Sequence, residues 1–148
     1  MKKIVMFEGG VETLAYFSKQ MAEQFVKMGY AVFFYNLKDE KGSAKRLRKF
    51  IKPGETVMIT FNFQGLEKED GVYSEKSGYV WDEYKIPCYN IAADHPYYYD
   101  NALSHCLLHL ADSSFCILKR NYITGGIFLK ILSRISKFWI SSVSGNRA

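Results

Sequence analysis

Short runs of strand-forming residues alternate along this chain with stretches whose apolar residues recur at helical spacing. Most positions in each strand-like run are apolar, as in strands buried on both faces of a parallel sheet. The predicted strands are residues 3–7, 30–37, 56–63, 86–93, 114–118 and 137–143. The predicted helices are residues 12–28, 43–51, 79–85, 102–110 and 123–135. Because such alternation requires right-handed βαβ crossovers, it predicts one Rossmann-like α/β domain with a mainly parallel sheet flanked by helices.

Two finer expectations accompany this fold. Strands 3–7 and 86–93 are expected to be neighbours near the centre of the sheet. Residues 64–78 are polar and punctuated by glycine, which predicts a mobile loop between the third strand and the next helix.

The basic character of the chain is concentrated in its last part. The formal net charge is +5, but residues 113–148 carry six Lys or Arg and no Asp or Glu. We therefore divide the chain into an α/β body, residues 1–112, and a basic tail, residues 113–148, that completes the sheet. A truncated or frame-shifted reading of a longer gene would produce such a tail. Lys130, Arg134 and Lys137 share one helical face, which fits either a core helix with a solvated basic side or a helix on a membrane surface.

The amino-terminal segment and the cysteines indicate a cytoplasmic protein. The apolar run before Glu8 is too short for a secretory signal, and no apolar stretch of about 18 residues occurs that could span a membrane. Cys88, Cys106 and Cys116 form no C-x-x-C pair and are expected to be free thiols.

The chain contains no sequence motif for a metal, a nucleotide or a nucleic acid. His105 and His109 share a helical face, but the residues between them are not those of a zinc protease, so we expect ordinary helix histidines. Bases and aromatics are not interleaved as in nucleic-acid-binding modules. We therefore expect no metal, no resident cofactor and no nucleic-acid partner.

Polar and glycine residues follow three of the predicted strands. In an open parallel sheet, ligands bind outside the carboxyl ends of the strands. The residues placed there are Glu8, Gly9 and Gly10 after the first strand, Asn62 and Gln64 at the end of the third, and Asp94, His95 and Tyr97 after the fourth. The glycine turn brings backbone N–H groups toward an anion or a sugar hydroxyl, or is a plain tight turn, since both phosphate-binding glycine motifs are absent.

The segment D-H-P-Y-Y-Y-D, residues 94–100, is the most informative of these. A histidine beside a carboxylate suits general-base chemistry, because its ordinary pKa of about 6.5 lies near operating pH. Tyrosine rings suit stacking on a sugar or a base. In the alternative interpretation, Asp94 caps the next helix and the tyrosines pack in the core.

The segments F-E-G-G, T-F-N-F-Q-G-L and I-P-C-Y-N-I-A-A-D-H-P-Y-Y-Y together resemble the amino-terminal half of bacterial CgeB-like glycosyltransferases of the GT-B architecture. The resemblance covers about residues 3–110. It implies an acceptor-side domain that is inactive alone and meets a nucleotide-sugar only through a missing second domain. It assigns the base to Asp94 or His95, and contacts with a sugar acceptor to Glu8, Gly9, Gly10 and Asn62.

Two other functions stay open at this point. The chain could be a stand-alone flavodoxin-like binding or regulatory module without enzymatic activity. It could also be a membrane-peripheral protein held by its basic tail.

Overall fold

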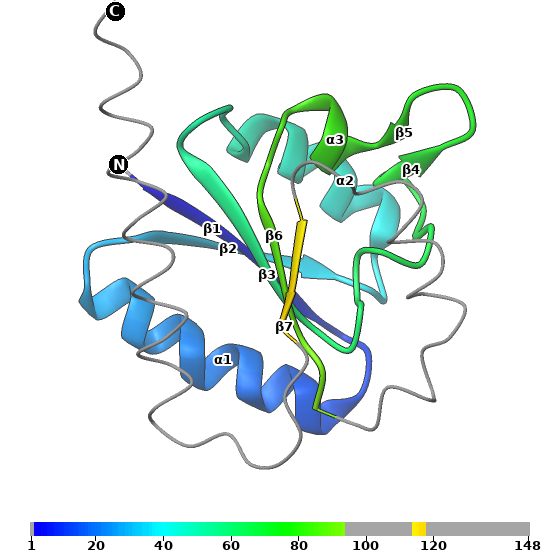
Figure 1. The fold of residues 1–148 in the computed structure, drawn as a ribbon. Coiled ribbons are helices and arrows are strands. Elements are labelled where there is room, and N and C mark those ends of the chain that lie inside the picture. Colours follow the sequence, from blue (N-terminus) through cyan, green and yellow to red (C-terminus); the bar gives the residue numbers. More distant parts are fainter. Residues whose placement is uncertain (1, 94–113, 118–148) are drawn as a thin grey trace, which may run out of the picture.

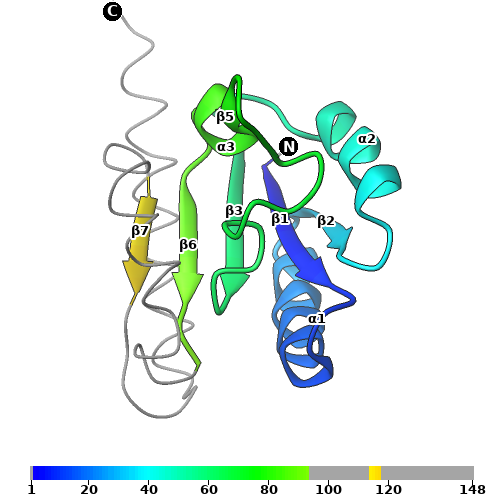
Figure 2. The ribbon, with the colours of Figure 1, turned by 90° about the vertical axis from the view of Figure 1, so that its right-hand side faces the viewer.

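The computed structural model describes residues 2–93 and 114–117, and its centre is a five-stranded sheet. The strands are β1 (Lys3–Glu8), β2 (Ala31–Asn36), β3 (Thr56–Phe61), β6 (Cys88–Ile91) and β7 (Ser114–Ile117). They lie in the order β2-β1-β3-β6-β7, and every neighbouring pair is parallel (Figures 1 and 2). The predicted Rossmann-like α/β fold with a parallel sheet is confirmed.

The expected contact between the first and fourth predicted strands is wrong. β3 lies between β1 and β6, and its residues pair with both strands. All six residues of β3 are buried, so this strand takes a central position with a neighbour on either side. The resulting order is the flavodoxin-like one, whose switch point lies between β1 and β3.

Helices cover both faces of the sheet (Figure 1). Helix α1 (Glu12–Lys27) lies on one face, and α2 (Glu40–Phe50) and α3 (Val80–Glu83) lie on the other. The buried residues of α1 recur at three- and four-residue spacing, as predicted, and the helix ends before Gly29, whose φ is +83°. These residues are Leu14, Ser18, Met21, Ala22 and Phe25.

Helix α2 begins three residues earlier than predicted, and α3 is a single turn. Asp39 is the N-cap of α2, and its carboxylate accepts a hydrogen bond from the Gly42 N–H at 3.1 Å. The early start is therefore explained by capping, which satisfies an amide that the helix itself leaves unpaired.

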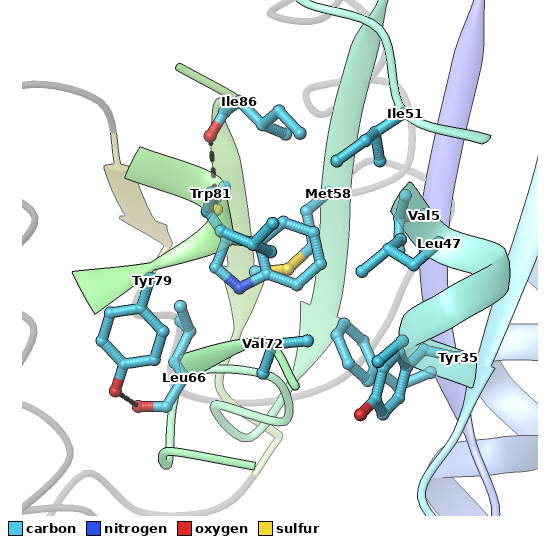
Figure 3. Packing of buried hydrophobic residues seen from close by; sticks show 14 of the residues in the cluster. Val5, Tyr35, Leu47, Ile51, Met58, Leu66, Val72, Tyr79, Trp81 and Ile86 are labelled. Carbon is cyan, nitrogen blue, oxygen red and sulfur yellow. Dashed lines mark hydrogen bonds between the residues drawn. The ribbon is translucent and has the colours of Figure 1, made fainter. Parts of the chain in front are cut away.

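The segment predicted to be a mobile loop includes a short hairpin and two apolar side chains that pack in the core. It contains a short antiparallel hairpin of β4 (Tyr73–Ser74) and β5 (Gly78–Tyr79). Leu66 and Val72 are buried, and the Tyr79 hydroxyl donates to the Leu66 carbonyl at 2.7 Å. Figure 3 shows these side chains and Trp81 within one apolar cluster. Apolar residues inside a polar segment anchor it.

Several predictions fall outside the described residues. The predicted helices 102–110 and 123–135 and the predicted strand 137–143 lie there, together with most of the basic tail. Of the tail, residues 114–117 form β7, which confirms the predicted fifth strand over that range. Within the described part of the chain, no helix combines the length and the apolar character needed to cross a membrane.

Candidate functional site

The candidate site is the edge of the sheet at which the central strands end. β1 ends at Glu8, β3 at Phe61 and β6 at Ile91. Because the strands are parallel, the residues that follow each of them emerge at the same edge, beside the switch point between β1 and β3. Five of the predicted site residues are described here, namely Glu8, Gly9, Gly10, Asn62 and Gln64. Asp94, His95 and Tyr97 lie outside the described residues, which stop at the preceding residue, Ala93.

Gly9 allows a close contact between the first turn and the end of β2. Its φ is +87°, and a β-carbon there would collide with Asn36 Oδ1 and lie 3.1 Å from the Leu37 and Lys38 nitrogens. Asn36 Oδ1 itself accepts from the Lys38 N–H at 2.9 Å. Packing alone therefore requires glycine at position 9, whether or not a ligand binds there.

Gly10 brings the first turn against the segment that follows β3. A β-carbon on Gly10 would lie 2.7 Å from Gln64 Nε2 and 3.0 Å from Leu37 Cδ1. The two predicted site segments, the glycine turn and Asn62–Gln64, are thus neighbours. Helix α1 starts directly after this turn, and its N-cap, Val11, contributes no side-chain hydrogen bond. The first turn of α1, whose amides have no partner within the helix, therefore begins at the same edge, and the N-cap side chain satisfies none of them.

Gln64 has a buried polar atom without a hydrogen bond. Its Oε1 is buried and accepts from no group in the described part of the chain. An unsatisfied buried acceptor costs about 1–3 kcal/mol, so most proteins avoid it except at functional sites. The backbone of Gln64 is held firmly, because its carbonyl accepts from Thr60 Oγ1 at 2.6 Å.

Asn62 and Asn90 join the ends of β3 and β6 reciprocally. Asn62 Oδ1 accepts from the Ala93 N–H, and Asn90 Oδ1 accepts from the Phe63 N–H, both at 2.8 Å. Both asparagines are buried. Asn62 therefore has a structural role in addition to its predicted role as a substrate contact, because its side-chain oxygen already holds Ala93, the residue that precedes Asp94.

The turn after β3 has an uncommon backbone. Asn62 and Phe63 have φ values of 49° and 61°, and the Gln64 N–H donates to the Phe61 carbonyl at 3.2 Å. Two consecutive left-handed residues are typical of a type I′ turn, which normally holds Asn and Gly. Phe63 is fully buried in the turn, so packing holds it in a conformation that costs about 1 kcal/mol or more.

After the turn, residues 65–69 are held in place by packing and by hydrogen bonds. Gly65, with φ +82°, lies directly on the Phe7 ring, where a β-carbon would collide. The Gly65 carbonyl accepts from Trp81 Nε1 at 2.8 Å. The Glu69 carboxylate accepts from the Gly65 and Glu67 N–H groups. Burial raises the pKa of Glu69 above its ordinary value, and these backbone hydrogen bonds lower it in part.

Glu8 lies at the end of β1 and is the charged group of the described site. Its carboxylate is 3.7 Å from Lys19 Nζ on α1, and its side chain is 27% exposed. A partly exposed carboxylate of this kind can accept hydrogen bonds from hydroxyl groups, while its lysine partner offsets its charge.

Three residues that support the site were not among those predicted from the sequence. Asn90, Glu69 and Trp81 act through the hydrogen bonds described above. A polar Asn90 within the apolar run C-Y-N-I was a usable signal, because an amide in a buried strand requires a partner. The sequence around Glu69 and Trp81 did not indicate their roles, since the way the loop folds decides which groups they hydrogen-bond.

Within residues 2–93 and 114–117, no cluster of His, Cys, Asp or Glu could hold a metal ion. His105, His109 and Cys106 lie outside these residues. The described edge therefore offers hydrogen-bonding groups: a carboxylate, a side-chain amide and free backbone N–H groups.

No family model matches this chain, and neither a curated protein nor a solved structure matches it. The structure by itself defines the class of protein as a Rossmann-like α/β domain with flavodoxin-like strand order.

Proposed function

We propose that this chain is the acceptor-side amino-terminal domain of a GT-B glycosyltransferase. Joined to a donor-binding domain, it would help transfer a sugar from a nucleotide-sugar to an acceptor, and it would be inactive alone. The observation that carries the proposal is the meeting of Glu8, Gly10 and Gln64 at one sheet edge. There the Gln64 amide nitrogen faces Gly10, and the buried amide oxygen has no hydrogen-bond partner among the described residues.

The chemistry of this edge suits a neutral, hydroxyl-rich ligand. A sugar hydroxyl can donate to a carboxylate and accept from a backbone N–H, and the edge presents both kinds of group. A phosphate-binding glycine motif is absent, which fits a domain that does not hold the nucleotide itself. Asn62 ties Ala93, the last described residue before Asp94, to this edge. Asp94 and His95 are our candidates for the base. Tyr97 follows as a stacking group for the acceptor.

The strand order favours a second candidate, a flavodoxin-like binding module without enzymatic activity. In flavodoxin, which has that order, FMN binds at the switch point between the first and third strands of the sheet. The glycine turn after β1 and the turn after β3 flank that point in this chain. Fold alone does not assign function, so a ligand experiment has to separate the two candidates.

The test is an NMR titration of the 148-residue chain with three probes: simple saccharides such as glucose and N-acetylglucosamine, UDP, and FMN. We expect saccharides to shift the amide signals of Gly9, Gly10 and Gln64, and we expect UDP to leave them unchanged. Shifts caused by FMN alone would support the second candidate. Tight UDP binding would contradict the proposed division between acceptor and donor domains.

Two matched leucine variants sharpen this test. Gln64→Leu removes the side-chain amide at nearly constant volume, and it should weaken saccharide binding about fivefold, the effect of losing one hydrogen bond. Gln24→Leu makes the same change on the exposed side of α1 and should leave binding unchanged.

Catalysis is tested in an enzyme that also contains a donor-binding domain. There, His95→Ala should lower turnover about a hundredfold or more, while the melting temperature stays the same. A fall in stability without a specific fall in turnover would assign His95 to the fold.

A further inference from the structure

Among the described residues, the outer side of β2 has no neighbouring strand. β2 is the first strand of the sheet, and among the described residues it pairs with β1 alone (Figure 2). The Ala31 N–H donates to the Lys2 carbonyl at 3.0 Å, and the Leu37 N–H donates to the Glu8 carbonyl at 2.8 Å. Odd-numbered residues of β2 therefore direct their backbone groups toward β1. Since successive residues of a strand face opposite sides, Val32 and Phe34 direct theirs outward.

The free edge ends at Asn36. The outward N–H of Asn36 donates to Ser43 Oγ at 3.0 Å, so the start of α2 occupies that position. Within the described part of the chain, the outward N–H and C=O groups of Val32 and Phe34 have no such partner. Two donor–acceptor pairs are thus available, at alternate residues, for another strand.

The side chains of this edge lack the usual protection. β2 has the sequence A-V-F-F-Y-N, without charge or proline, although natural edge strands normally carry such features to prevent pairing. Val26 and Met28, just before β2, are 58% and 50% exposed. Among the described residues, four large apolar side chains are exposed, and Val26 and Met28 are two of them.

We propose that β2 pairs with β2 of a second copy of this chain, antiparallel about a two-fold axis, so that the two sheets become continuous. In this register, Val32 lies opposite the partner's Phe34, and Phe33 lies opposite the partner's Phe33 on the axis. Both outward donor–acceptor pairs of each copy are then used. Asn36, capped by Ser43, ends the pairing.

The strand is self-complementary in this register. A two-fold axis perpendicular to the sheet keeps residues of one face on the same face, and it places a β-branched residue opposite an aromatic one, a favourable cross-strand pair. No like charges face each other, because the strand carries none. Pairing of one short strand buries less area than the roughly 1,200 Å² of a stable interface, so the dimer should be weak.

Amide hydrogen exchange at several protein concentrations, with a reductant present, tests the proposal on the unmodified chain. We expect the Val32 and Phe34 amides to exchange about fourfold more slowly near millimolar protein than at about 10 µM, as for a weak dimer with a Kd of about 100 µM. The Phe33 and Tyr35 amides, which face β1, should be protected at both concentrations. Sedimentation equilibrium should show the mass approaching twice the monomer value over the same range.

Two variants at one position complete the test. Val32→Pro removes an outward N–H that β1 does not use, and it should abolish dimerisation, whereas Val32→Thr keeps the N–H and should preserve it. A chain that stays monomeric at millimolar concentration would overturn the proposal. So would a dimer whose protected amides lie elsewhere than at Val32 and Phe34. If the proline variant fails to fold, the exchange experiment on the unmodified chain still decides.

Discussion

The turn after β1 and the segment after β3 lie at the same edge of the sheet but are held very differently. Residues 62–72 are tied by the asparagine pair, by Trp81 and by Glu69, and they rest on the buried Phe7 ring. The turn at Gly9 and Gly10 is partly exposed and leads into a helix without a side-chain cap. We call residues 62–72 the rigid wall of the candidate site, and the partly exposed turn at Gly9 and Gly10 its open wall.

This difference indicates how such a site works. A functional constellation needs groups held in position by surrounding packing, and the segment after β3 provides that support. The glycine turn has no comparable support, because it is partly exposed and leads into a helix without a side-chain cap. Loss of a contact should therefore cost much stability in the first segment and little in the second.

The largest effect is expected for Gly65→Ala. The substitution forces an L-residue into φ +82° and drives a methyl group into the Phe7 ring. Left-handed strain and overpacking together should lower the free energy of unfolding by about 3 kcal/mol. Urea denaturation measures this loss.

Gly54→Ala is the matched control for that variant. Gly54 has a similar φ of +73°, but nothing lies within 4 Å of the added methyl group. Gly54→Ala should lower the free energy of unfolding by about 1 kcal/mol, because it introduces backbone strain without a collision. Equal losses in the two variants would show that the Gly65 contact with Phe7 is unimportant.

A smaller effect is expected at Asn62. Asn62→Ala removes the acceptor of the Ala93 N–H and places alanine at φ 49°, which should cost about 2–3 kcal/mol. Asn62→Gly removes the same hydrogen bond but tolerates the backbone, so it should cost about 1 kcal/mol less. Thermal unfolding of both variants compares the two contributions. If glycine were as damaging as alanine, the left-handed backbone would not contribute.

The pH dependence of stability provides a third test of the rigid wall. Burial raises the pKa of Glu69, so between its ordinary value of 4.5 and the raised value the folded chain binds more protons than the unfolded chain. The contribution of Glu69 is therefore fully present below about pH 4.5 and is lost as the pH rises through the raised pKa. Glu69→Gln should remove this fall in unfolding free energy.

Glu67→Gln is the control for the pH experiment. The Glu67 pKa is also raised by burial, but its side chain accepts neither of the two backbone hydrogen bonds that Glu69 receives. The Glu67 variant should keep most of the slope that the Glu69 variant loses. Parallel pH profiles for the parent chain and Glu69→Gln would contradict the assignment.

The smallest effect is expected for Gly10→Ala in the open wall. Gly10 has no positive φ, and its added methyl group would meet the movable end of Gln64. Stability should change by less than about 1 kcal/mol, as for most surface substitutions. The free energy of saccharide binding, measured by the same NMR titration, should change more than the free energy of unfolding does. A loss of stability like that of Gly65→Ala would mean that both walls are rigid.

Local sequence pattern was sufficient to predict the main strands and helices of the described chain. Spacing of apolar residues located α1, and uninterrupted apolar runs located the buried strands, because both signals depend on neighbouring residues alone. The edge at which Glu8, Gly10 and Gln64 meet was also predictable, since all parallel strands end on the same side.

Strand order and loop packing were decided only by the tertiary structure. Nothing local to β3 shows that it separates β1 from β6, because any strand that is mostly apolar fits a central position. Likewise, residues 64–78 are polar on average, yet Leu66 and Val72 anchor them beneath Trp81 and Tyr79. The sequence by itself determined the elements and the shared edge, because these depend on periodicity and strand direction. The rigid wall depends on hydrogen bonds between residues such as Asn62 and Ala93, which come together only when the sheet has formed.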